Sequence, residues 1–146
     1  MQHVTLMMIV GSLAVAVLVG AAAQSPQSTT VTYADRDRVT KGGSLVASPD
    51  YSVSVLRRTS PGQVEIHEKE ADIFYVIDGE ATFVTGGTMV GGKVSRPNQL
   101  LGTDIQGGET RQLKKGDVIV IPAGVPHWFK EIQQPIQYFT VKSIKP

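Results

Sequence analysis

Beyond residue 30 the chain consists of short apolar or alternating segments that turn-forming residues separate. QVEIH (63–67), DIFYVI (72–77) and DVIVI (117–121) are rich in β-branched and aromatic residues, and Ser-Pro-Asp, Ser-Pro-Gly and Gly-Gly sequences stand between such runs. None of these segments repeats with the 3.6-residue period of a helix. Many short strands at close spacing predict an all-β barrel or sandwich. The strands that we expect are residues 31–33, 44–47, 51–59, 63–67, 72–77, 80–85, 110–113, 117–121, 127–132 and 136–144.

Two stretches between these strands carry predictions of their own. Asp78-Gly79, between segments 72–77 and 80–85, has the sequence of a tight hairpin turn. Residues 88–108 contain six glycines or prolines and little periodicity, which predicts a long irregular loop. Loops of that length are often functional or mobile, and a surface insertion is the alternative that the sequence leaves open.

The N-terminal residues have the pattern of a secretory signal peptide. Residues 4–20 are apolar apart from Thr5 and Ser12, and three alanines and a polar tract follow them. An apolar run before a small-residue site is typical of such signals, so we expect cleavage after Ala23 and export to the periplasm or the exterior. A retained N-terminal membrane anchor is the alternative. We accordingly divide the chain into a signal (1–23), a flexible leader with a first strand (24–40) and a barrel (41–146).

Composition narrows the classes of function. A chain of 146 residues suggests one domain with a real core. Its 14 basic and 13 acidic residues are nearly balanced and form no basic block, which argues against a nucleic-acid partner. Because the chain has no cysteine, neither disulfides nor a thiolate zinc site is possible.

The stretch EIHEKEAD (65–72) contains the first candidate metal ligands. Glu65 and His67 alternate on one strand and therefore point to the same face. Asp72 opens the next strand after a short turn, which would bring it near the pair. We interpret Glu68 and Glu70, on either side of Lys69, as solvated turn residues.

The fourth candidate ligand is His127, in the segment GDVIVIPAGVPHWF (116–129). Pro122 and Pro126 stiffen the turn before it, and Gly124 permits a backbone conformation that other residues resist. Of the three histidines in the chain, only His67 and His127 lie outside the expected signal. Two histidines and two carboxylates suit a divalent Mn, Fe or Zn ion.

These two segments resemble the paired motifs of the cupins, G-x5-H-x-H-x3–4-E-x6-G and G-x5-P-x-G-x2-H-x3-N. The second motif is matched at Gly116, Pro122, Gly124 and His127, with Glu131 in place of its asparagine. The first motif is altered, because Glu65 takes the first histidine position and Asp72 the glutamate position, while His67 takes the second histidine position and Gly79 the closing glycine.

The resemblance implies a cupin-type jelly-roll barrel, a homodimer and a metal held by Glu65, His67, Asp72 and His127. Phe74, Phe83 and Phe129 would line a pocket beside the ion. Arg57 shares a strand face with Val53 and Val55 and would reach inward to bind an anionic substrate, with an exposed strand-end arginine as the alternative. Two carboxylates would leave a divalent ion close to neutral.

The resemblance further implies a metal-dependent enzyme acting on a small organic molecule, of dioxygenase, isomerase or decarboxylase type. Two alternatives stay open. One is a non-catalytic module that binds a small ligand outside the cytoplasm, and the other is a purely structural ion with four protein ligands.

Overall fold

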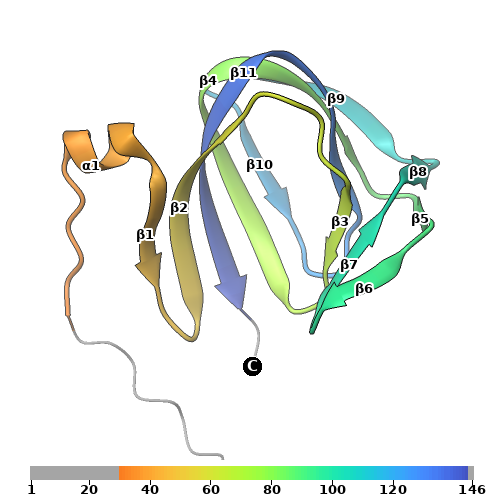
Figure 1. The fold of residues 1–146 in the computed structure, drawn as a ribbon, viewed down its shortest axis with the longest axis horizontal. Coiled ribbons are helices and arrows are strands. Elements are labelled where there is room, and N and C mark those ends of the chain that lie inside the picture. Colours follow the sequence, from red (N-terminus) through yellow and green to blue (C-terminus); the bar gives the residue numbers. More distant parts are fainter. Residues whose placement is uncertain (1–29, 145–146) are drawn as a thin grey trace, which may run out of the picture.

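A computed structural model describes residues 30–144 of the chain and shows an all-β barrel (Figure 1). The expected signal peptide and its cleavage site lie outside the described residues. Within residues 30–144 no helix is long and apolar enough to cross a membrane. The elements are α1 (Arg36–Lys41), β1 (Gly43–Ala47), β2 (Tyr51–Arg58), β3 (Val64–His67), β4 (Glu70–Thr85), β5 (Thr88–Val90), β6 (Lys93–Arg96), β7 (Gln99–Gly102), β8 (Asp104–Gln106), β9 (Glu109–Lys114), β10 (Val118–Ile121) and β11 (His127–Ile144).

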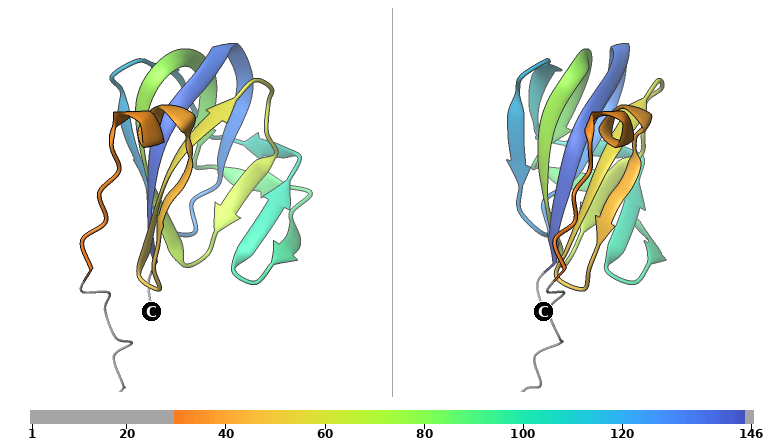
Figure 2. Two further views of the ribbon diagram at one scale, coloured as in Figure 1. Left: turned by 60° about the vertical axis from the view of Figure 1, so that its left-hand side comes forward. Right: turned by 90° about the vertical axis from the view of Figure 1, so that its left-hand side faces the viewer.

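Two long strands, β4 and β11, form the centre of the fold. They pair antiparallel from His127 opposite Thr85 to Ile144 opposite Glu70. β11 also pairs with β2, and at its first residue with β3, while β4 pairs with β9 and β10. Figure 2 shows β9 and β10 on one side of the β4–β11 pair and β1 and β2 on the other. Segments far apart in sequence thus surround one interior.

Apolar side chains from both halves of β4 and β11 fill that interior. The buried cluster consists of Phe74, Val76, Ala81, Phe83, Leu113, Ile121, Phe129, Ile136 and Tyr138. Aromatic rings dominate it, and Phe83 packs against Phe129 with ring centroids 4.6 Å apart. The all-β class expected from the sequence is confirmed.

The hairpin predicted at Asp78-Gly79 is wrong, because β4 runs through these residues without reversing. Gly79 has φ +88°, and a Cβ there would collide with the carbonyl oxygen of Pro135 in β11. The pairing shifts register between Gln134 and Gln137, opposite this glycine. Gly79 therefore allows a bulge and a close approach of two backbones rather than a turn.

The bulge changes which residues of β4 face the interior. Before it, Asp72, Phe74 and Val76 are buried and the residues between them are exposed; after it, Ala81 and Phe83 belong to the core. The inward positions thus change from even to odd numbers. A strict two-residue alternation therefore cannot be followed from one end of the strand to the other.

The long loop predicted for residues 88–108 is also wrong. These residues form β5, β6, β7 and β8, and β7 pairs with β3 so that His67 lies opposite Gln99. The residues that suggested irregularity are turn residues here: Gly91 and Gly107 have positive φ, and so has Asn98. Strands of three or four residues leave too little sequence for a visible period.

At the N-terminal side, the strand expected at 31–33 is absent, and a short helix, α1, follows instead. The side chain of Asp35 caps it by accepting a hydrogen bond from the backbone N–H of Arg38 at 2.8 Å. Six residues are too few to display a helical period, which is why the sequence pattern did not reveal this element.

Candidate metal centre

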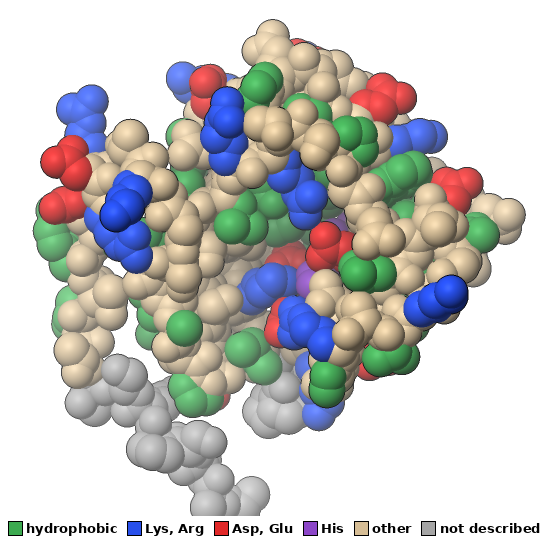
Figure 3. Space-filling model, in the orientation of Figure 1, with side chains coloured by type: hydrophobic (Ala, Val, Ile, Leu, Met, Phe, Trp, Pro, Cys, Tyr) green, Lys and Arg blue, Asp and Glu red, His purple; other side chains and the backbone are tan. Residues whose placement is uncertain are grey.

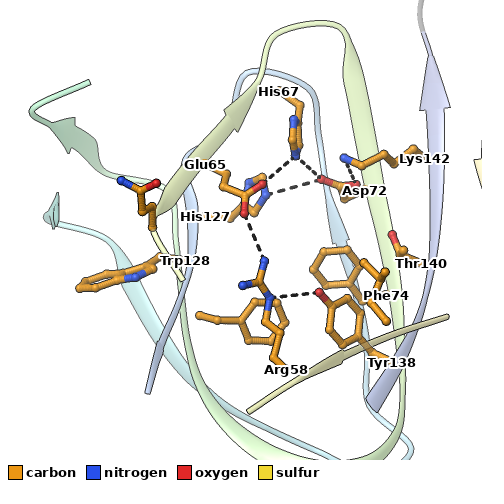
Figure 4. Close-up of a pocket in the computed structure, with 13 residues that line it drawn as sticks. Arg58, Glu65, His67, Asp72, Phe74, His127, Trp128, Tyr138, Thr140 and Lys142 are labelled. Atoms are coloured by element: carbon orange, nitrogen blue, oxygen red, sulfur yellow. Dashed lines mark hydrogen bonds and ion pairs between the residues drawn. The ribbon is translucent and has the colours of Figure 1, made fainter. Parts of the chain in front are cut away.

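The four expected ligands, Glu65, His67, Asp72 and His127, converge at the floor of a cavity inside the barrel (Figure 4). Glu65 and His67 come from β3, Asp72 from the start of β4 and His127 from the start of β11. His67, Asp72 and His127 are at most 5% exposed, and Glu65 is half-buried. Burying histidines and carboxylates costs free energy unless they are hydrogen-bonded, paired with an opposite charge or bound to an ion.

The distances between their donor atoms match a metal coordination shell. His67 Nε2 lies 3.4 Å from Glu65 Oε2 and 3.5 Å from Asp72 Oδ2, and His127 Nε2 lies 3.5 Å from the same Asp72 oxygen. Bonds of about 2.1 Å to a central ion place neighbouring ligand atoms about 3.0 to 3.4 Å apart. The spacings are longer than good hydrogen bonds and suit ligands that surround an ion.

Three of these residues form a compact group of potential ligands. Donor atoms of Glu65, His67 and His127 all lie within 4.8 Å of one another. This nitrogen–oxygen set fits Mn, Fe or Zn and does not fit a soft ion such as Cu(I). The cluster could therefore hold a divalent ion, with Asp72 placed to add a fourth ligand.

Local backbone contacts explain how the turn before β11 presents His127. Gly124, with φ +82°, donates its N–H to the carbonyl of His67 at 2.8 Å, which ties the turn directly to the end of β3. His127 Nδ1 lies 3.1 Å from the carbonyl oxygen of Val125. When Nδ1 donates to that oxygen, the lone pair of Nε2 points at the ligand cluster. The sequence motif thus fixes both the place and the tautomer of this histidine.

Two ligands have shifted pKa values. Burial raises the pKa of Glu65, but the contact with His67 and the charges of His127 and Arg58 outweigh it and bring the pKa to about 2. Burial lowers the pKa of His127 from its ordinary value of 6.5. Both shifts favour the ionised carboxylate and the neutral imidazole at neutral pH, which are the forms that bind metal.

Behind the ligands, Lys142 of β11 forms ion pairs with two carboxylates. Its Nζ lies 2.7 Å from Asp72 Oδ1 and 3.1 Å from Glu70 Oε2. Glu70 in turn lies 3.7 Å from His67 Nδ1. The interpretation of Glu70 as a solvated turn residue is wrong, because its side chain is only 19% exposed. Because Lys142 contacts Oδ1 of Asp72, the other oxygen of this carboxylate, Oδ2, faces His67 and His127.

At the other side of Glu65, Arg58 enters the cavity. Its Nη2 lies 3.2 Å from Glu65 Oε1, and its Nε donates to the hydroxyl of Tyr138 at 3.2 Å. The expectation that Arg57 reaches inward is wrong, since Arg57 is exposed and takes no part in the cavity lining. The apolar residues Val53 and Val55, which share its face, do not point to the cavity.

The cavity has a volume of about 70 Å³, and Phe74 and Phe129 form part of its wall, as expected. Phe83 does not line it; its side chain is fully buried in the core behind His127, with ring centroids 6.3 Å apart. In Figure 3, acidic, basic and histidine atoms gather in a hollow of the surface. The site is therefore open to small solutes.

Sequence reasoning missed Arg58 and Lys142 and placed Glu70 in a solvated turn. A signal for Lys142 was present in the sequence. Along the last strand it follows Ile136, Tyr138 and Thr140 at intervals of two residues, which places all four on one face. Since Ile136 and Tyr138 are buried core residues, Lys142 had to follow them to the same face. Arg58 had no comparable signal, because both faces of β2 carry apolar residues.

The fold and the site define an all-β barrel with a histidine–carboxylate cluster at the floor of an internal cavity. The profile of the Cupin family matches residues 25–146, so the chain belongs to the cupin family. A search of curated proteins found no match.

Three solved structures illustrate the shared fold. BH2720 from Bacillus halodurans is 14% identical with a TM-score of 0.55, and the match covers 80% of this chain and 88% of that chain. TT1209 from Thermus thermophilus is 17% identical with a TM-score of 0.54, and the match covers 80% of this chain and 100% of that chain. The Cnp3 cupin domain from Schizosaccharomyces pombe is 14% identical with a TM-score of 0.51, and the match covers 71% of this chain and 60% of that chain. The chain spans less than two thirds of that Cnp3 chain. Identities this low establish the fold alone.

Proposed function

We propose that this cupin is a metal-dependent enzyme that acts on a small organic molecule. The observation that carries the proposal is the convergence of Glu65, His67 and His127 donor atoms within 4.8 Å at the floor of a cavity. A bound divalent ion would supply Lewis acidity, or electron transfer if it is redox-active. Dioxygenase, isomerase and decarboxylase chemistry all start from a small molecule that approaches such an ion.

The chain's own residues would bind, orient and shield the reacting molecule. His67 and His127 would hold the ion through Nε2, the atoms that face Asp72, and the carbonyl of Val125 orients the ring of His127. Phe74 and Phe129 exclude water from one wall of the cavity. Their rings stack with centroids 6.0 Å apart, and the cavity volume of about 70 Å³ limits the ligand to a small molecule.

A second candidate, ligand binding without turnover, is favoured by one specific observation. Among residues 30–144, each carboxylate that lines the cavity is already ion-paired, Glu65 with Arg58 and Asp72 with Lys142. Neither is a free general base. Chemistry at this site would then depend on the ion alone, and a binding protein would need no base at all.

Metal content tests the proposal. The protein is purified without a histidine tag or chelator, and metals are quantified by inductively coupled plasma mass spectrometry. We expect about one Mn, Fe or Zn ion per chain, and a loss of most of it in Glu65→Ala, His67→Ala and His127→Ala. Glu68→Ala, an exposed neighbour, is the matched control and should keep the ion. A wild-type protein that stays empty after incubation with each ion would exclude a metal enzyme.

Turnover separates the two candidates. The metal-loaded and chelated proteins are assayed with a panel of small organic acids, and oxygen uptake, carbon dioxide release and isomerised product are followed. Metal-dependent consumption of one acid supports the enzyme. Saturable binding without any product, in protein of full metal content, supports the binding module.

A further inference from the structure

The charged side chains that line the cavity cancel one another before any ion binds. Arg58 and Lys142 are basic, Glu65 and Asp72 are acidic, and each acid is paired with one base. Glu70, behind Lys142, adds one negative charge. A divalent ion would therefore leave the cavity with a net positive charge. This corrects the expectation that two carboxylates would bring a bound ion close to neutral, because that count omitted the two bases.

A net positive charge inside a low-dielectric cavity favours an anionic ligand. Arg58 is the residue placed to receive it. A guanidinium has five N–H donors, and the contacts of Arg58 with Glu65 and Tyr138 use two of them. The guanidinium also lies over the ring of Phe129, 5.0 Å from its centroid, which holds its plane in the cavity wall. Planar N–H donors suit a carboxylate better than a lysine would.

Tyr138 adds a second donor beside Arg58. Its hydroxyl oxygen accepts from Arg58 Nε, so the hydroxyl hydrogen is left to donate to another group. Burial raises the pKa of Tyr138, which keeps this hydrogen in place at neutral pH. A guanidinium and a hydroxyl next to one another, both directed into the cavity, form a donor pair for an oxyanion (Figure 4).

Glu65 demonstrates that a carboxylate spans the distance from Arg58 to the metal ligands. One of its oxygens lies 3.2 Å from Arg58 Nη2, and the other lies 3.4 Å from His67 Nε2. A second carboxylate of the same size, brought in by a ligand, would reach from Arg58 to an ion at the histidines in the same way. The cavity volume of about 70 Å³ limits the rest of that ligand to a few atoms.

We infer that the cavity selects small organic monocarboxylates, with the carboxylate placed between the bound ion and the Arg58–Tyr138 donor pair. The inference rests on the proposed metal function and names its ligand class. Arg58 and Tyr138 are then specificity-determining residues. Neutral molecules of the same shape are bound weakly, because they leave the positive charge of the ion and of Arg58 uncompensated.

Trp128 provides the readout. It is the single tryptophan of the chain and lines the cavity, where its Nε1 donates to the carbonyl of Gly62 at 2.8 Å. Tryptophan fluorescence of the metal-loaded full chain is titrated with acetate and with acetamide, a neutral molecule of nearly the same shape. Metal content and circular dichroism are measured on every sample. The variants are Arg58→Gln, Arg58→Lys, Tyr138→Phe and, as matched control, Arg57→Gln on the exposed face of the same strand.

Wild type is expected to bind acetate at least about tenfold more tightly than acetamide. Arg58→Gln should lose this preference, Arg58→Lys should recover part of it, and Tyr138→Phe should weaken acetate binding severalfold, all with metal retained. Arg57→Gln should behave as wild type. Equal binding of acetate and acetamide by metal-loaded wild type, or full acetate binding by folded, metal-loaded Arg58→Gln, overturns the inference and leaves the metal function standing. A chain that takes up no metal overturns both.

Discussion

Replacing Lys142 with methionine should destabilise the metal-free protein far more than the metal-loaded protein. Lys142 Nζ lies 2.7 Å from Asp72 Oδ1, and the Asp72 side chain is only 2% exposed. Methionine keeps most of the apolar stem but removes the charge, so a buried carboxylate loses its nearest cation. Breaking a buried pair in this way costs about 3–5 kcal/mol.

The partial exposure of Lys142 puts the expected loss of unfolding free energy at the lower end of this range. Its side chain is 25% exposed, so water screens part of the interaction, and we expect a loss of about 3 kcal/mol, or roughly 10 °C in Tm. An ion bound at Asp72 Oδ2 supplies a new counter-charge to the same carboxylate. In the metal-loaded protein the loss should therefore fall to less than half.

Urea unfolding of chelated and metal-loaded samples, with Tm from circular dichroism, measures both values. Lys93→Met changes an exposed lysine in the same way and should alter the free energy of unfolding by no more than about 0.5 kcal/mol. A loss below about 1 kcal/mol in the metal-free protein would refute the argument that Asp72 depends on Lys142. Equal losses with and without metal would refute the argument that the ion and the lysine compensate the same charge.

Two further predictions concern acid stability and the strand bulge. The pKa of Glu65 is lowered from 4.5 to about 2, so its ionised form stabilises the fold above pH 4.5, and that contribution, about 3 kcal/mol, is lost as the pH falls towards 2. Glu65→Gln should therefore flatten the dependence of unfolding free energy on pH in this window; an unchanged slope would contradict the assignment. Gly79→Ala should cost more than about 2 kcal/mol in urea unfolding, because the methyl group meets Pro135 in addition to the strain of φ +88°. Gly116→Ala, with φ +92° but nothing within 4 Å, isolates the strain and should cost about 1 kcal/mol, and equal losses would exclude the collision.

The parts of the site that sequence reasoning predicted are those that short-range geometry determines. Glu65 and His67 share a face because they alternate on one strand, and His127 follows a turn whose prolines and glycine are adjacent in sequence. The residues that it missed depend on long-range pairing. Lys142 meets Asp72 only because β11 pairs with β4 in that register, where the two residues lie opposite one another.

The errors in the fold have the same origin. An Asp-Gly pair is a hairpin signal in a free chain, but here Gly79 lies against the backbone of β11, and the two long strands continue past it. The many glycines of residues 88–108 likewise indicate turns, and only the pairing of β7 with β3 shows that strands lie between them. Local sequence indicates where turns can form and which residues share a face. Pairing with the partner strand determines whether such a position becomes a turn or a bulge, and whether a strand forms beside it.

The change from even to odd inward positions along β4 makes the site sensitive to the length of the chain as well as to its residues. Asp72 lies before the bulge and the core residue Phe83 after it, and both point inward because one half of the strand is out of phase with the other. Deleting a single residue between Asp72 and Gly79, with the bulge and the core residues after it kept in place, would move Asp72 by one position along the strand and turn its side chain to the outer face. A homologue one residue shorter in this stretch could retain every candidate ligand in its sequence and still lack the carboxylate in the cavity, so an alignment that scores only residue identity would misjudge it.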